Sequence, residues 1–160
     1  MEKKEIEESV RRITDLIRDK GNAAQTEEIV RILEGDANLR EYLSTQTKFH
    51  RADSPLHAAS SENAPDIMKL LIEDYNLQLD SRQESHNIHY FFFSRTPLHR
   101  AISHTNVEAV KMLLEYGADP ELGGIEDGEE FQNALQLAKR SGGKTIVDIL
   151  RNWKPGEKPL

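Results

Sequence analysis

The sequence predicts an all-α fold built from repeated pairs of helices. Two observations carry this prediction. Apolar residues recur at helical spacing along most of the chain, and one pattern of residues occurs three times, starting at Ser54, Thr96 and Asn133. With 160 residues the chain has the length of one domain. We therefore expect residues 1–160 to form a single domain.

Three helices are expected before the first copy of the pattern. The first covers residues 5–20 and is followed by the stop signal Gly21. A second helix is expected over residues 26–34 with Thr26 as its N-cap, and a short third one within residues 37–48. The apolar residues that define these helices are Ile6, Val10, Ile13, Leu16, Ile17, Ile29, Val30, Leu33, Leu39, Tyr42 and Leu43.

Each copy of the pattern opens with a side chain suited to capping a helix. Ser54, Thr96 and Asn133 can each accept a hydrogen bond from a free N–H of the first turn. Pro55 and Pro97 follow in the first two copies, at a helix position where the missing N–H costs nothing. A leucine, an alanine, a turn and a second apolar helix then recur. Each copy therefore predicts a helix-turn-helix unit.

The segments TPLHRA and VEAVKMLLEYGAD, together with this layout, resemble the ankyrin repeat. The resemblance is strong over residues 95–121 and good over 53–74. It is degenerate over 131–151, where Ala134 and Gln136 replace the proline and the histidine. The resemblance implies a solenoid of stacked helix-turn-helix units with extended hairpin or loop fingers between them, and an N-terminal helical cap.

Two of the expected fingers are longer than the family pattern requires. Pro55 and Pro97 are 42 residues apart, and Pro97 and Ala134 are 37 apart, against a family period of about 33. Insertions in such stacks lie in loops. The expected segments are an N-terminal cap or diverged repeat (5–52), a repeat (53–80), a lengthened finger (81–94), a repeat (95–121), a lengthened finger (122–132), a degenerate C-terminal capping repeat (133–153) and a tail (154–160).

The composition narrows the classes of partner and of chemistry. A net charge of −7 argues against nucleic acid, whose binders usually present a basic face. No stretch approaches the roughly 18 apolar residues of a spanning helix, so no membrane partner is expected. The chain has no cysteine, which excludes disulfides and thiolate chemistry and favours an intracellular location, cytoplasmic or nuclear.

The histidines are the main candidates for chemistry. His57 and His99 belong to the two TPLH segments, where the resemblance implies hydrogen bonds between neighbouring turns. His50, His86 and His89 could come together near the first long finger, and an enzyme or metal-binding protein using them is one alternative. We assign no catalytic, cofactor-binding or metal-ligating residue and expect no cofactor.

Two segments of the fingers suggest a binding surface. The aromatic run from Tyr90 to Phe93 ends the first long finger, and strand alternation would bury one of its faces and expose the other. Between Lys111 and Lys139 there are seven acidic residues and no Lys or Arg. This acidic segment either solubilises a loop or attracts a basic partner.

The function predicted from these features is a non-catalytic protein–protein interaction module, an inhibitor or adaptor whose partner carries a basic or apolar segment. We expect a monomer with at most weak self-association, and a self-associating scaffold is the second alternative. The resemblance places partner contacts on the fingertips and on the exposed face of the first helices, which form a concave groove. The residues expected to line it are His50, Arg51, Asp53, Ser61, Glu62, Phe92, Phe93, Arg95, Ser103, His104, Glu129, Glu130, Gln132 and Arg140.

Overall fold

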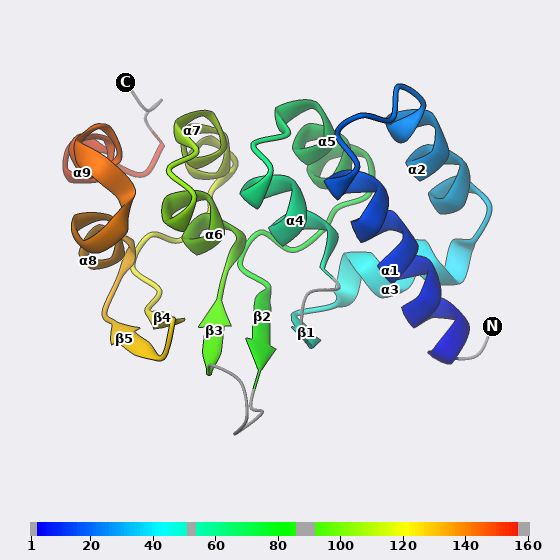
Figure 1. The fold of residues 1–160 in the computed structure, drawn as a ribbon, viewed down its shortest axis with the longest axis horizontal. Coiled ribbons are helices and arrows are strands. Elements are labelled where there is room, and N and C mark those ends of the chain that lie inside the picture. Colours follow the sequence, from blue (N-terminus) through cyan, green and yellow to red (C-terminus); the bar gives the residue numbers. More distant parts are fainter. Residues whose placement is uncertain (1–2, 51–53, 86–91, 157–160) are drawn as a thin grey trace.

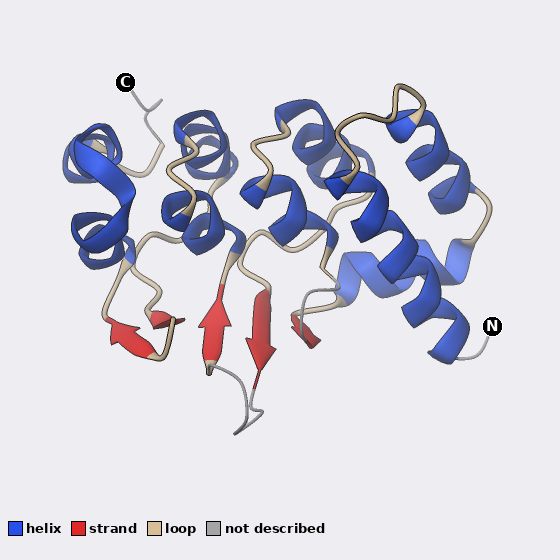
Figure 2. Ribbon diagram, viewed as in Figure 1, coloured by secondary structure: helices blue, strands red, loops and turns tan. Residues whose placement is uncertain are grey.

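The computed structural model describes residues 3–50, 54–85 and 92–156, which form a row of helix pairs with short strands along one edge (Figures 1 and 2). The row begins with the N-terminal helices and ends with α9. The strands project below the helices and lie side by side in the direction in which the helix pairs are stacked (Figure 2).

Three N-terminal helices form where the apolar spacing predicts them: α1 (Lys3–Arg18), α2 (Gln25–Glu34) and α3 (Ala37–Thr45). Their apolar stripes are buried, with Ile13, Leu33 and Leu43 fully so. Helix α1 packs against α4 (Pro55–Ser61), while α2 and α3 pack against α1 and against each other. That this unit acts as the N-terminal cap stays a prediction.

The predicted N-cap at Thr26 is wrong. Helix α2 starts one residue earlier, at Gln25, after Ala24, which makes no side-chain cap. The Gln25 amide Nε2 instead donates to the carbonyl oxygens of Leu16 and Ile17, the latter at 2.9 Å. Because these carbonyls lie at the free C-terminal end of α1, Gln25 ties the two helices together.

All three copies of the repeated pattern form a pair of helices. The first helix of each pair is α4, then α6 (Pro97–Ser103), then α8 (Ala134–Leu137) with the π-helical turn η2 (Ala138–Gly142). The second helix is α5 (Pro65–Lys69) with the π-helical turn η1 (Leu70–Asp74), then α7 (Val107–Tyr116), then α9 (Gly143–Asn152).

The expected caps form in two of the three copies. The Thr96 side chain accepts a hydrogen bond from the His99 N–H, and the Asn133 side chain accepts one from the Gln136 N–H at 2.9 Å. Ser54 differs from this expectation, because its Oγ pairs with Nδ1 of the buried His57 and caps no backbone group. Gly117 ends α7 with a φ of 101°, a left-handed conformation that glycine adopts without steric cost.

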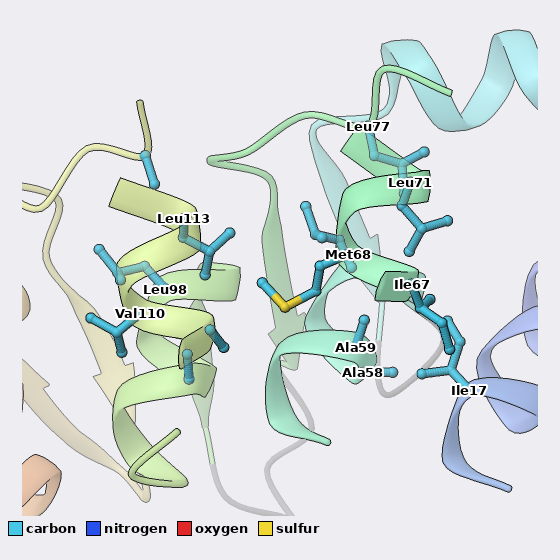
Figure 3. Packing of buried hydrophobic residues seen from close by; sticks show 14 of the residues in the cluster. Ile17, Ala58, Ala59, Ile67, Met68, Leu71, Leu77, Leu98, Val110 and Leu113 are labelled. Atoms are coloured by element: carbon cyan, nitrogen blue, oxygen red, sulfur yellow. The ribbon is translucent and has the colours of Figure 1, made fainter. Parts of the chain in front are cut away.

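The core lies between successive pairs (Figure 3). Met68 is fully buried and extends between its own pair and the pair formed by α6 and α7 (Figure 3). Ala58 and Ala59 place only methyl groups at the surface of α4, so neighbouring helices can approach closely. Leu98 and Leu113 bury the facing side of the next pair. One continuous apolar cluster therefore runs through the stack.

The fingers pair into a five-stranded sheet, so the all-α prediction is incomplete. Its strands are β1 (Lys48–His50), β2 (Arg82–Ser85), β3 (Phe93–Arg95), β4 (Gly124–Glu126) and β5 (Glu129–Phe131), arranged in that order. Strands β1 and β2 are parallel, and the other neighbours are antiparallel. Each extended segment pairs part of its backbone N–H and C=O groups with a neighbouring strand, a partner that the local sequence does not reveal.

The β4–β5 finger turns through Asp127 and Gly128, which have φ values of 52° and 78°. Two positive φ angles are typical of the tight turn that fits a twisted hairpin. Gly124 allows β4 to approach β3, because a Cβ there would lie 2.4 Å from the Ser94 carbonyl oxygen. The second long finger is therefore a hairpin held against the first one.

Candidate functional site

A cluster of opposite charges lies where the sheet meets the first helices. Glu126 of β4 is 7% exposed, and its Oε1 accepts hydrogen bonds from Arg95 Nη1 at 2.5 Å and Arg100 Nη1 at 3.4 Å. We call Arg95, Arg100 and Glu126 the ion cluster. It joins β3, β4 and α6, and its two guanidinium groups exceed its one carboxylate by a unit of positive charge.

The ion cluster is continued by polar and aromatic contacts. Arg100 Nε donates to Ser61 Oγ of α4 at 3.1 Å, and Arg95 Nε donates to Gln83 Oε1 of β2 at 2.9 Å. The Arg95 guanidinium also lies 4.0 Å from the centre of the Phe93 ring, within the range of a cation–π interaction. Five elements thus meet at one preorganised set of side chains.

Burial shapes the electrostatics of this cluster. Desolvation, followed by repulsion from Arg95, lowers the pKa of Arg100 from its ordinary value. The carboxylate of Glu126 acts against this shift. Glu126 Oε2 is buried and accepts no hydrogen bond from any residue that the structure describes. The cluster is therefore charged, partly shielded from water, and retains one free acceptor.

Phe92 directly precedes β3 and is 44% exposed, the largest exposure of a bulky apolar side chain in the described part of the chain. Its carbonyl oxygen accepts a hydrogen bond from the Gly128 N–H at 3.3 Å, which links the start of β3 to the turn of the second finger. Phe93 is half-buried beneath Arg95. Phe91 lies outside the described residues. We call the region that includes Phe92, the ion cluster and the first helices the finger–helix face.

Several other predicted binding residues contribute to this face or border it. Ser61 takes part through its bond to Arg100, whereas Glu62 forms an ion pair with Lys20 of the loop after α1 at 3.0 Å. Ser103 has a buried Oγ with no partner within the described ranges. His104 is exposed at the end of α6, and its pKa is lowered by partial burial and by Arg100.

The remaining predicted residues lie at the two ends of the sheet. Glu129 pairs with Arg140 at 3.3 Å, while Glu130 and Gln132 are exposed on or beside β5. His50 ends β1. Arg51 and Asp53 are outside the described residues.

The acidic segment carries less free charge than its sequence suggests. Glu126 is buried against two arginines, and Glu129 is paired with Arg140. The three arginines all lie outside the acidic segment in the sequence. Asp127 and Glu130 remain exposed at the tip and on β5. The negative field that would attract a basic partner is therefore weaker at the finger than the composition indicates.

Sequence reasoning missed Arg100 and Glu126 as members of the site. In the sequence, Arg100 is one residue of the TPLHRA segment, and Glu126 is one of the seven acids between Lys111 and Lys139. Nothing in the local pattern pairs them, because 26 residues separate them along the chain. An unpaired arginine on a first helix and an acid in the next finger are the only signal that could have indicated this contact.

His57 and His99 have the structural role that the resemblance implies. His57 Nε2 contacts the Arg95 carbonyl oxygen at 2.8 Å, and His99 Nε2 contacts the Leu122 carbonyl oxygen at 3.0 Å. His99 Nδ1 accepts from the Thr96 N–H, so the ring is neutral with its proton on Nε2. Burial lowers the pKa of His57 to about 3 and that of His99 to about 4. Each ring thus links its own repeat to the next finger.

The alternative of a metal site depends on His50, His86 and His89. His86 and His89 lie outside the described residues. Within the described ranges, no group of three or more His, Cys, Asp or Glu side chains is placed to hold a metal ion.

Stacked helix pairs with projecting fingers define a repeat protein. The chain belongs to the ankyrin-repeat family, since the family described as ankyrin repeats (3 copies) matches residues 21–123. Ankyrin repeats are generally protein–protein interaction modules, and members of the family are typically non-enzymatic. The match begins just before α2 and ends at the start of β4.

Three curated proteins illustrate the similarity. The chain is 32% identical over 100 residues to Ankyrin repeat and SOCS box protein 14 of Mus musculus, covering 61% of the chain and 15% of that protein. It is 32% identical over 109 residues to Alpha-latrocrustotoxin-Lt1a of Latrodectus tredecimguttatus (68% and 7%), and 30% identical over 95 residues to Transient receptor potential cation channel subfamily A member 1 of Homo sapiens (57% and 8%).

The chain thus spans 15% or less of the length of each of these relatives. The similarity concerns the repeats and not the whole architecture of those proteins. Among the described residues we find no helix with the length and apolar content needed to span a bilayer.

Proposed function

We propose that this chain is a non-catalytic interaction module that binds a partner protein through the finger–helix face, as an inhibitor or adaptor. The exposed ring of Phe92 is the observation that carries the proposal. A phenylalanine ring that stays exposed at the start of a finger strand is unfavourable in water, whereas interfaces are enriched in such rings. An intracellular setting, cytoplasmic or nuclear, agrees with the absence of cysteine.

The polar part of the face supports specificity. The arginines of the ion cluster are held by Gln83, Ser61 and Glu126, so they lose little side-chain entropy on binding. Glu126 Oε2 is buried, so the partly exposed guanidinium groups of Arg95 and Arg100 are the polar groups of the cluster that a partner can reach. A partner would therefore place an apolar group on Phe92 and a hydrogen-bond acceptor near these arginines.

The proposal is tested with Phe92→Ala as bait beside the wild-type chain. The control is Glu108→Ala, which changes an exposed residue of α7 away from the fingers. Proteins retained by wild type and control but lost by Phe92→Ala are the candidates. With one of them purified, calorimetry is expected to show about 2 kcal/mol weaker binding, or about 30-fold, for Phe92→Ala.

The variant separates binding from folding. Because Phe92 is exposed, Phe92→Ala should unfold at nearly the wild-type temperature, whereas changing Phe93 would also disturb Arg95. A partner that binds Phe92→Ala and wild type equally well would refute the proposed face. Light scattering that shows mass rising with concentration in wild type, and not in Phe92→Ala, would assign the face to self-association instead.

A further inference from the structure

The second helices of neighbouring pairs are linked by a repeated tyrosine–glutamate contact. Tyr75, at the end of η1, donates its hydroxyl to Glu34 Oε1 at 2.7 Å. Tyr116, at the end of α7, donates to Glu73 Oε1 at the same distance. In both contacts the tyrosine stands at the C-terminal end of a second helix, and the glutamate lies in the last turn of the second helix before it.

At the third helix pair, the corresponding hydrogen bond is missing among the described residues. Trp153 directly follows α9, where the earlier tyrosines stand, and Glu115 lies in the last turn of α7 as Glu73 does in η1. The indole Nε1 of Trp153 is nevertheless buried with no hydrogen-bond partner among the described residues. A buried donor left unpaired costs about 1 to 3 kcal/mol, so a small movement of this ring that brings the donor to an acceptor would be favourable.

The same two side chains line a cleft of about 920 Å³ between α7 and the C-terminal end of α9. Figure 1 shows the chain after α9 turning back toward α7 at this place. The apolar wall consists of Leu114, Leu135 and Leu150 together with the Trp153 ring. Clefts of this size with apolar walls and few polar groups are typical ligand sites.

The charge of the cleft has one sign. Glu115, Asp119 and Glu121 are exposed at its edge, and the described residues that line it include no Lys, Arg or His. The cleft shares no residue with the ion cluster or with Phe92. It is therefore separate from the finger–helix face and selects for a cation beside an apolar group.

We propose that this cleft binds a short segment of a partner protein in which a leucine-like side chain is followed by a lysine or arginine. The apolar side chain packs on Leu135 and Leu150. The Trp153 Nε1 is covered in the structure, so a small shift of the ring lets a backbone carbonyl of the segment accept its hydrogen bond, and the cation pairs with Glu115. The segment thus supplies an acceptor for the Trp153 indole, which has none among the described residues, and a cation for Glu115.

The test uses the full chain and the probe peptide acetyl-Leu-Lys-Leu-Lys-amide. Trp153 is the only tryptophan of the chain, so its indole N–H gives a single resonance in a nitrogen–proton correlation spectrum. We expect a saturable downfield shift of this resonance, with a dissociation constant of about 1 mM or tighter, weakening as salt is added. Matched peptides replace both lysines by glutamate or both leucines by serine, and neither is expected to bind.

Two double variants test whether the acidic residues of the cleft contribute to binding of the lysine probe. Glu115→Gln/Glu121→Gln keeps the side-chain shapes and is expected to weaken the lysine probe about three- to tenfold. Glu108→Gln/Glu130→Gln removes the same charge at exposed positions outside the cleft and is expected to leave binding unchanged.

Three outcomes would overturn the proposal. The first is an indole resonance that does not move with the lysine probe, and the second is an equal shift with the glutamate peptide. The third is a resonance that moves with protein concentration alone, which would assign the cleft to a second copy of the chain. None of these outcomes bears on the finger–helix face, because Phe92→Ala tests that face independently.

Discussion

His57 and His99 make the stability of this protein sensitive to mild acid. Both rings are buried and neutral, with pKa values lowered to about 3 and about 4, whereas a histidine in the unfolded chain titrates near 6.5. Below that value the unfolded chain gains protons that the folded chain cannot bind. The two neutral rings therefore leave the free energy of unfolding undiminished above about pH 6.5. This free energy falls as the pH drops toward 4 and then 3.

The size of the effect follows from these values. At about pH 5.5, one unit below the unfolded pKa, each histidine favours the unfolded chain by about 1.4 kcal/mol. The two folded pKa values lie well below this pH, so the folded chain has almost no compensating gain. We expect the free energy of unfolding to fall by about 3 kcal/mol between about pH 7.5 and 5.5. That is a large fraction of the 5 to 15 kcal/mol typical of a domain, about a fifth or more.

Urea unfolding followed by circular dichroism at the two pH values measures this loss. His99→Gln removes one of the two titrating rings and should halve the loss to about 1.5 kcal/mol, even though the variant starts from a lower stability. His104→Gln changes an exposed imidazole on the same helix and should leave most of the loss in place. A wild-type stability equal at both pH values, or a full loss in His99→Gln, would refute the argument from buried neutral rings.

Two further predictions concern the junction of the fingers and the helices. Glu126→Ala leaves two guanidinium groups without their carboxylate and should lower the free energy of unfolding by about 3 kcal/mol, whereas Glu129→Ala breaks an exposed pair and should cost under about 1 kcal/mol. Equal losses in urea unfolding would contradict the difference in burial. Gly124→Ala places a methyl group 2.4 Å from the Ser94 carbonyl oxygen and should lower the thermal midpoint by several degrees, an effect of about 2 kcal/mol. Gly21→Ala meets no atom within 4 Å and is its control; if both glycine variants melt with the wild type, β3 and β4 are not held as closely as the contact implies.

The repeat architecture could be predicted because its signals are local. The capping side chains at Thr96 and Asn133, the prolines after the N-caps and the glycine at position 117 each act within one or two turns of helix. Such signals need no knowledge of the rest of the chain. Ser54 is an exception, since this capping side chain at the equivalent position pairs with the buried His57 and not with a backbone N–H.

The sheet and the site depend on contacts between distant residues. Arg95 and Glu126 are 31 positions apart, and Tyr116 and Glu73 are 43 apart. Which charges meet depends on how the long fingers lie against their neighbours, and the sequence specifies only that these fingers are long. The same limit applies to the cleft at Trp153, whose walls come from α7, α8 and α9.

By itself the sequence determined the helices, their repetition and the membership of a family of stacked repeats, because apolar spacing and helix caps are properties of neighbouring residues. Only the tertiary structure decided that the fingers form a sheet, that Glu126 is buried between two arginines and that the indole N–H of Trp153 has no hydrogen-bond partner among the described residues. The physical reason is that burial and charge pairing arise between segments far apart in the sequence. Loop length and packing together determine which of these segments meet.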